Sequence, residues 1–361
     1  MEPAAAPVRA PWPEPPDPGS AREIAEGVLW MRIPLAMRPD HVNVYALDEP
    51  DGWTLVDTGL DTPACREAWA ALIGGPLKGR RIVRVVVTHH HPDHVGLAGW
   101  FQAHQGAALW TTRTAWLYAR MLQLDEQARP SPQALAFWRA AGMEPDLLAA
   151  RARGRPFNFA DVTAPLPVGY RRIAQGDRIE AGGRGWRVEI GHGHAPEHAT
   201  LWGEDHDLVL TGDQVIAGIT PNLGVHPTEP EADPVGDWME SCARLGVLAR
   251  PGHLALPGHR LPFTGLRARL DALHRHQSEA LARLEGFLAG PRTGAECFRI
   301  LYGREIGAAE YGLALAEAMG HLNHLARTGR VRRTDRGDGV WLWERMARVA
   351  DFPADTAARS R

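Results

Sequence analysis

A run of β-branched residues that ends in a cluster of histidines is the feature that most restricts the fold of this chain. Residues 81–87, RIVRVVV, have the breadth of a buried strand. The segment Thr-His-His-His-Pro-Asp-His follows directly at 88–94. Imidazole and carboxylate side chains at the end of a strand are typical of a metal site. The sequence therefore predicts a buried strand that carries metal-binding groups at its end.

The spacing within residues 88–94 indicates which side chains act together. In an extended chain, residues two apart face the same side, so His89 and His91 can converge on one ion while His90 points away. A turn at the following proline would let Asp93 and His94 reach a second ion alongside. Three nitrogens and a carboxylate suit zinc, although iron and manganese accept the same groups.

Composition restricts the class of protein. The 361 residues suffice for one large and one small domain. The 40 basic and 43 acidic residues give a net charge of −3, which predicts neither a nucleic-acid nor a membrane partner. No stretch of 18 apolar residues occurs. Residues 1–20 are rich in proline and lack the pattern of a signal peptide, so we expect a disordered tail and a cytoplasmic protein.

Residues 21–264 show the pattern of an α/β domain. Residues 41–47 and 53–59 predict paired strands joined by a turn, and residues 61–73 predict a helix with an Asp or Thr cap. Later short strands each end in glycine or a polar residue. Residues 113–170 are mostly helical, and we interpret them as an insertion that forms a lid or substrate wall, or that only packs.

Residues 265–361 change to a pattern of three helices followed by a hairpin. This order is typical of a winged helix. The segment carries 16 arginines against 12 acidic residues, a balance of only +4, which gives weak support for DNA binding. Packing or formation of a homodimer is the alternative role. The three cysteines, Cys65, Cys242 and Cys297, fit neither a disulfide framework nor a CxxC metal site.

The ends of the later strands supply four further polar motifs in a fixed order. They are Asp57 in LVDTG, His194 in GHGHAPEH, Asp213 in LTGD and His259 in LPGH. Together with residues 88–94, these motifs resemble those of the metallo-β-lactamase fold superfamily of hydrolases. The resemblance covers residues 23–263. It implies a four-layer αββα sandwich, which the winged-helix-like segment would follow.

The resemblance also implies a site for two divalent metal ions. The first metal would be bound by His89, His91 and His194, and the second by Asp93, His94 and His259. Asp213 would bridge the two together with a hydroxide. Asp57 would orient a ligand without touching metal. His192 competes with His194 for the third motif, the spacing to the following APEH favouring His194, and His198 is expected at the rim or behind a ligand.

Such a ligand set predicts hydrolysis. Two cations about 3.5–4 Å apart lower the pKa of a shared water, so that hydroxide exists at neutral pH. Asp93 is placed to receive a proton as well as to bind metal. An aspartate at the position of Asp213 bridges the metals in the thioesterase, lactonase and nuclease branches of the superfamily and does not do so in its true β-lactamases. We therefore expect hydrolysis of a small-molecule acyl bond, in a thioester, ester or lactone.

Two alternatives remain open. A metal-dependent phosphodiesterase or ribonuclease would need a basic groove, which the net charge of −7 on residues 1–264 disfavours. A regulator with a vestigial site would need a broken ligand set. Glu197 and Arg260 stand where glyoxalase-II-like motifs have glycine. They are expected either to pair with each other or to contact substrate at the rim.

Overall fold

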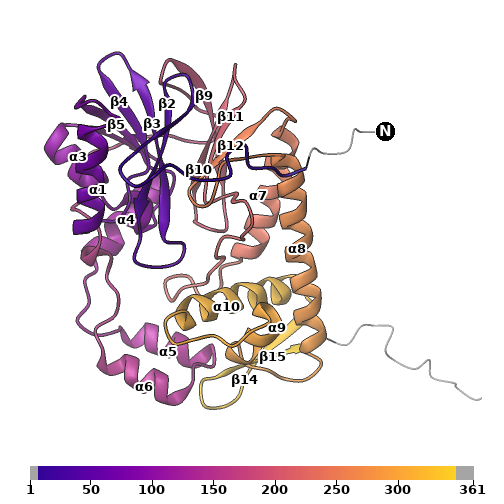
Figure 1. Cartoon of the computed structure of the whole chain (residues 1–361). Coiled ribbons are helices and arrows are strands. Elements are labelled where there is room, and N and C mark those ends of the chain that lie inside the picture. Colours follow the sequence, from indigo (N-terminus) through magenta and orange to yellow (C-terminus); the bar gives the residue numbers. More distant parts are fainter. Residues whose placement is uncertain (1–6, 347–361) are drawn as a thin grey trace, which may run out of the picture. The chain divides into compact units, whose positions relative to one another are not determined.

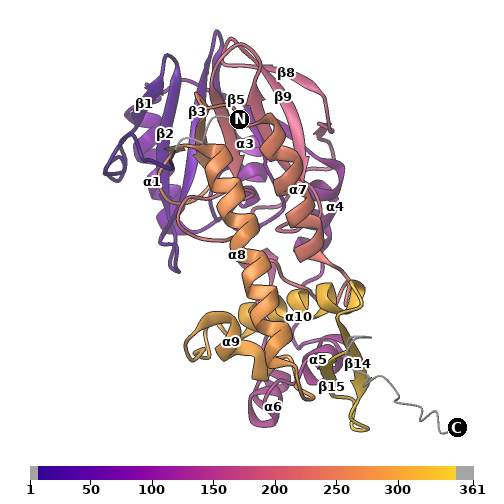
Figure 2. The same cartoon turned by 90° about the vertical axis from the view of Figure 1, so that its right-hand side faces the viewer.

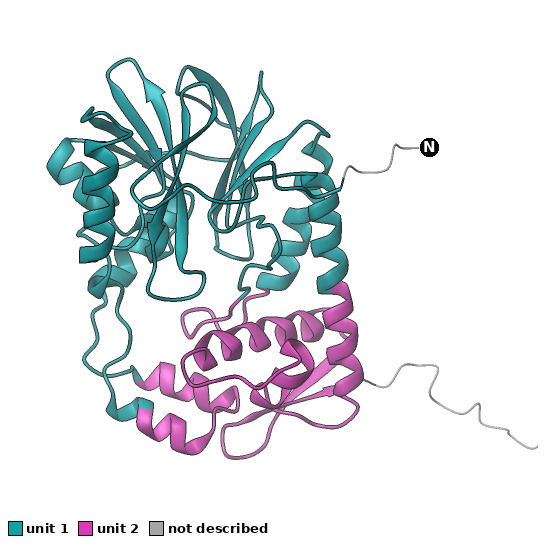
Figure 3. Cartoon of the chain, viewed as in Figure 1, with its two compact units in different colours: residues 1–131, 151–223, 234–277 teal, residues 132–150, 224–233, 278–361 magenta. Residues whose placement is uncertain are grey.

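The computed structural model describes residues 7–346, which form two compact units (Figure 3). Unit 1 comprises Met1–Ser131, Arg151–Leu223 and Pro234–Gln277. Unit 2 comprises Pro132–Ala150, Gly224–Asp233 and Ser278–Arg361. Within residues 7–346, no helix is both long and apolar enough to cross a bilayer.

Unit 1 contains two mixed β-sheets. The seven strands of the first sheet lie in sequence order: β1 (Arg22–Ala25), β2 (Val28–Pro34), β3 (His41–Glu49), β4 (Gly52–Val56), β5 (Ile82–Val86), β6 (Ala108–Thr111) and β7 (Arg171–Arg172). The six strands of the second lie in the order β13 (Phe263–Thr264), β12 (Leu254–Pro257), β11 (Leu208–Gly212), β10 (His198–Gly203), β9 (Arg184–Gly191) and β8 (Arg178–Ala181). The expected pair of strands is present as β3 and β4, which run antiparallel.

The two sheets pack face to face (Figure 1). Alternate residues of a strand point to opposite faces, so Trp30 and Tyr45 enter the cluster between the sheets while Met31 and Val44 point outward. The outward cluster is covered by α1 (Pro63–Gly74) and α3 (Ala98–Gln105). The sequence expectation for α1 is correct, since Thr62 caps it by accepting from the amide of residue 65.

The second sheet is covered by α7 (Pro234–Leu248), as Figure 2 shows. The Arg244 guanidinium of α7 donates to Glu189 on β9 at 3.1 Å. The layers of unit 1 thus run helix, sheet, sheet, helix. The remaining helices of unit 1 are α2 (Pro92–Val95), α4 (Arg113–Leu124) and the short η1 (Phe159–Asp161). The helix α8 (Leu266–Phe287) begins in unit 1.

Unit 2 contains the expected helices and hairpin. Its elements are α5 (Pro132–Ala140), most of α6 (Pro145–Arg153), the end of α8, η2 (Ala295–Cys297), α9 (Phe298–Tyr302), α10 (Tyr311–Arg327), β14 (Val331–Asp335) and β15 (Trp341–Arg345). A capping box stands before η2, since the Thr293 amide donates to the Glu296 carboxylate at 2.7 Å and the Glu296 amide donates to the Thr293 hydroxyl at 3.4 Å.

Two sequence expectations about segments need correction. The helical stretch 113–170 is not one insertion: α4 belongs to unit 1, whereas residues 132–150 belong to unit 2. Residues 7–20 of the expected disordered tail have defined contacts, because Arg9 and Thr264 exchange backbone hydrogen bonds and Trp12 lies 6.3 Å from Trp30 between ring centroids. Residues 1–6 lie outside the described part. Cys65, Cys242 and Cys297 are buried and free, as expected.

Candidate metal centre

Five strand ends bring the predicted ligands and Asp57 to one edge of unit 1. β4 and β5 are parallel, as are β11 and β12, so the carboxyl ends within each pair lie together. Asp57 follows β4, residues 88–94 follow β5, and His194 lies in the loop after β9. Asp213 follows β11, and His259 comes shortly after β12. Side chains that are distant in sequence therefore meet because the chain leaves each of these strands at the same edge.

The first group comprises His89, His91 and His194, whose ligand atoms lie within 4.8 Å of one another. His89 Nε2 is 2.9 Å from His91 Nδ1. The ring centroids of His91 and His194 are 4.5 Å apart, with the rings nearly perpendicular. Three imidazoles face one another here, which suits a shared cation.

The second group comprises Asp93, His94 and His259, and Asp213 lies beside it. Asp93 Oδ2 is 3.3 Å from His259 Nε2 and 3.6 Å from His94 Nε2. Asp213 Oδ2 lies 3.1 Å from His259 Nε2, 3.5 Å from His94 Nε2 and 3.7 Å from His194 Nε2. One oxygen of Asp213 thus stands within reach of imidazoles from both groups.

Three of these imidazoles are oriented by a hydrogen bond at Nδ1. The Nδ1 of His259 is 2.7 Å from the His41 carbonyl oxygen, and that of His194 is 3.0 Å from the Asn222 carbonyl oxygen. The Nδ1 of His94 is 2.8 Å from the carboxylate of Asp57. A ring that donates from Nδ1 keeps Nε2 as its lone-pair nitrogen, so all three present Nε2 to the same space.

Asp57 holds the strand end in place. It is 2% exposed and lies in the left-handed region with φ 62°. Its Oδ1 accepts from the Thr88 amide and its Oδ2 from the Thr88 hydroxyl, both at 2.8 Å, in addition to the bond with His94. Its carboxylate is occupied by these bonds, so it orients His94 and braces the start of the histidine segment.

Burial and the close opposite charges shift the pKa values of the residues in this site. Burial opposes the charged form of His94, but the carboxylates of Asp213, Asp93 and Asp57 outweigh it and raise the pKa of His94 well above its usual value. The same balance raises the pKa of His259 to about 10. Burial alone would raise the pKa of Asp213, but His259 and His94 hold it well below the usual range. His94 and His259 therefore hold protons at positions where a divalent metal ion could bind.

The donor set fits divalent metal ions. His94 Nε2, His194 Nε2 and Asp213 Oδ1 are buried and have no hydrogen-bond partner among residues 7–346. Unsatisfied buried groups are costly unless something binds them. Gly258 makes room for the carboxylate, since a Cβ at this position would lie 2.2 Å from Asp213 Oδ1 and 2.7 Å from His94 Cε1. Sequence reasoning did not identify Gly258, although it stands in the fifth motif.

The other histidines of the third motif have separate places. The Nδ1 of His192 is 2.6 Å from the Pro196 carbonyl oxygen, and the side chain lies outside the two groups. His198 is fully buried, its ring lies over His89 at 4.6 Å between centroids, and its Nε2 accepts from the Asp213 amide at 3.0 Å. Accordingly, burial lowers the pKa of His198 to about 3, so it stays neutral and fixes the Asp213 backbone.

Glu197 and Arg260 do not pair with each other. The Glu197 carboxylate accepts from the Thr114 amide at 3.1 Å, which ties the third-motif loop to the start of α4. Arg260 has φ 69°, and its backbone is held because its amide donates to His41 Nε2 and its carbonyl accepts from Asn43. In the described part of the chain, the exposed Arg260 guanidinium has no hydrogen bond or ion pair.

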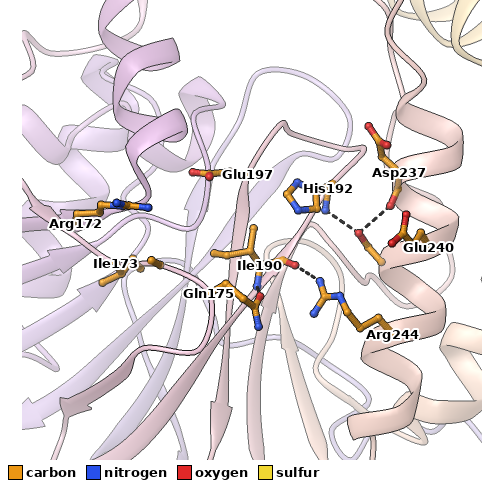
Figure 4. Close-up of a pocket in the computed structure, with 11 residues that line it drawn as sticks. Arg172, Ile173, Gln175, Ile190, His192, Glu197, Asp237, Glu240 and Arg244 are labelled. Atoms are coloured by element: carbon orange, nitrogen blue, oxygen red, sulfur yellow. Dashed lines mark hydrogen bonds between the residues drawn. The ribbon is translucent and has the colours of Figure 1, made fainter.

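A cavity of about 750 Å³ borders the loop that presents His194 (Figure 4). Arg172 lines one side, whereas Asp237 and Glu240 of α7 line the other, with His192 and Glu197 from the loop between them. The loop is fixed at this wall because the His192 amide donates to the Ser241 hydroxyl at 2.9 Å.

Comparisons with known proteins agree with this geometry. The family model described as "Metallo-beta-lactamase superfamily" matches residues 37–286, and that described as "Metallo-beta-lactamase-like, C-terminal domain" matches residues 281–346. The chain is 26% identical over 335 residues to the "Probable metallo-hydrolase YqjP" of Bacillus subtilis (strain 168), covering 88% of this chain and 98% of the relative.

Two solved structures are similar over nearly their whole length. A beta-lactamase domain protein from Burkholderia ambifaria is 33% identical with a TM-score of 0.87, covering 94% of this chain and 98% of that one. A metallo-beta-lactamase family protein from Thermus thermophilus is 27% identical with a TM-score of 0.75, covering 90% and 100%. The resemblance inferred from the motifs is confirmed, and the chain belongs to the metallo-beta-lactamase superfamily.

Proposed function

We propose that this chain hydrolyses an acyl bond of a small molecule, a thioester, ester or lactone, with two divalent metal ions, most simply zinc. It is a metallo-hydrolase of its superfamily. The observation that carries the dinuclear proposal is Asp213 Oδ2, which lies 3.1–3.7 Å from Nε2 atoms of His259, His94 and His194.

In this proposal His89, His91 and His194 hold one cation, and Asp93, His94 and His259 hold the other, with Asp213 between them. The bound pair would supply a hydroxide at neutral pH and polarise the oxygen of the scissile bond. Asp93 takes up the proton that the attacking group releases, because its carboxylate faces His259 Nε2 and His94 Nε2 at the centre of the site. Asp57 and His198 keep the surrounding groups in place.

Two observations favour a small-molecule substrate. The cavity of about 750 Å³ beside the His194 loop lies within the 300–1,000 Å³ typical of small-molecule sites. Its walls carry two basic side chains, Arg172 and Arg244, and three acidic ones, Glu197, Asp237 and Glu240, so they do not form the basic groove that a phosphodiester backbone requires. These charges argue against the ribonuclease alternative.

The test is metal analysis followed by a substrate panel. We expect about two metal ions per chain, and turnover of some member of a set of acyl-CoA thioesters, lactones and nitrophenyl esters, but not of bis-nitrophenyl phosphate. Asp213→Ala should lose both the second ion and the activity. Fewer than one ion per chain, or full activity in Asp213→Ala, would refute the dinuclear proposal, and turnover of the phosphodiester alone would favour the nuclease class.

For the elements after α8 we propose a winged-helix-like arrangement that serves packing or homodimer formation. The order of η2 with α9, α10 and the β14–β15 hairpin supports it. The charge balance of +4 on residues 265–361 is small for a DNA-binding module. A molar mass of two chains by light scattering, without a DNA mobility shift at physiological salt, is the expected result.

A further inference from the structure

Phe157 is an aromatic side chain that remains exposed on a braced segment of unit 1. Its side chain is 62% exposed. A contiguous exposed apolar surface marks a contact site for ligands or partners, whereas a single exposed apolar side chain does not, so the neighbours of Phe157 decide its meaning. Its ring lies 5.9 Å from that of Phe159 between centroids, so one side is packed while the other faces outward.

The segment around Phe157 is held by hydrogen bonds on both sides. The Asn158 side chain accepts from the Gln127 amide at 2.7 Å and donates to the Gln127 carbonyl at 3.1 Å. The Arg155 guanidinium donates to both oxygens of Asp161, at 2.6 and 2.7 Å. Folding has therefore already fixed the segment that holds Phe157, so a ligand that covers this side chain does not lose binding free energy by ordering a loop.

An aromatic path leads from Phe157 to the metal centre. Phe159 lies parallel to His90, with centroids 6.4 Å apart and planes at 7°, and Tyr118 of α4 lies 5.3 Å from His90. The His90 ring is 4.6 Å from that of the predicted ligand His91. His90 was expected to point away from the ion that His89 and His91 would bind. In the structure it joins the histidine segment to aromatic residues of α4 and η1.

We propose that Phe157, continued by Phe159 and Tyr118, is the wall that receives the apolar acyl chain or ring of the substrate. This inference rests on the proposed acyl hydrolysis and adds the class of acyl group. A wall of aromatic faces offers apolar area and few hydrogen bonds, so it favours a medium-length alkyl or an aryl acyl group over acetyl. Phe157 acts on substrate selection, and it has no part in the metal chemistry.

The test compares nitrophenyl acetate with nitrophenyl octanoate as substrates of the full zinc-loaded chain. In Phe157→Ala the ratio of kcat/KM for octanoate to that for acetate should fall about tenfold, which equals about 1.4 kcal/mol. Phe157→Trp should retain the ratio. Val247→Ala on α7 removes another exposed apolar side chain, 79% exposed, and should leave the ratio unchanged.

A binding measurement separates this inference from the proposed function. Octanoate should bind the zinc-loaded protein more tightly than acetate by calorimetry, and Phe157→Ala should weaken octanoate about tenfold without affecting acetate. If no ester, thioester or lactone is turned over, the proposed function fails, while the comparison of octanoate and acetate binding still tests the role of Phe157. Equal octanoate binding by wild type and Phe157→Ala overturns the inference. A change in molar mass in Phe157→Ala at an unchanged substrate ratio also overturns it, because Phe157 would then be a protein interface.

Discussion

Replacing Gly258 by alanine should damage the metal centre without a change in any charged group. The added Cβ would lie 2.2 Å from Asp213 Oδ1, whereas ordinary contact begins at 3.4 Å, so the carboxylate has to move by about 1.2 Å. The backbone is not free to move instead, because the Gly258 amide donates to the Gly212 carbonyl at 3.0 Å and its own carbonyl accepts from the Asn43 amide at 2.6 Å.

The size of the effect follows from that displacement. A misplacement of about 1 Å in a positioned catalytic group can cost about 100-fold in rate, or about 2.7 kcal/mol of transition-state stabilisation. We therefore expect kcat/KM to fall about 100-fold and the bound metal to drop below two ions per chain. Overpacking at a buried site also costs about 1–3 kcal/mol of folding free energy, which denaturant unfolding measures.

Gly246→Ala is the matched control. Gly246 lies in α7, where an added Cβ would meet only the Arg267 side chain at an ordinary 3.7 Å, and alanine favours a helix. This variant should retain wild-type activity and metal content. The reasoning is refuted if Gly258→Ala binds two ions with wild-type affinity and keeps its kcat/KM, or if Gly246→Ala loses as much.

Three further outcomes are expected. Asp57→Asn keeps a side chain that tolerates positive φ, but it loses the carboxylate that orients His94 and accepts from Thr88. Metal affinity or activity should therefore fall 10–100-fold. An unchanged metal affinity in titration with a competing chelator would show that the carboxylate does not orient His94. Loading metal at pH 7.5 should release at least two protons, one from His94, whose pKa is raised well above its usual value, and one from His259, whose pKa is about 10, in addition to the proton lost by the metal-bound water. Calorimetry in buffers of different ionisation enthalpy would contradict this if the apparent enthalpy did not depend on the buffer. Burial lowers the pKa of His253 from about 6.5 to about 4. The stabilising contribution of the neutral ring is complete above pH 6.5, and about 3 kcal/mol of it is lost as the pH falls toward 4. In His253→Gln the free energy of unfolding should depend less on pH over this interval, and an unchanged pH dependence would refute the assignment.

Many residues of the candidate site could be named from short segments of the sequence. Residues 88–94 indicate a metal site by their own spacing, whereas Asp57, His194, Asp213 and His259 are recognised because their motifs, in this order, resemble those of the superfamily. The helix cap at Thr62 was also predictable from the sequence, since a cap depends on residues within one turn. These features are local, so their residues specify them wherever the rest of the chain lies.

Contacts between segments far apart in sequence were not readable in this way. The Nδ1 partners of His194 and His259 are backbone carbonyls 28 and 218 residues away, and any residue type can supply a carbonyl. The clash that requires Gly258 depends on β11 and β12 lying side by side. The sequence by itself determined which groups could bind metal and on which kind of element each lies. Only the tertiary structure decided the distances, the partners and the room between these groups, because burial and long-range packing fix them together.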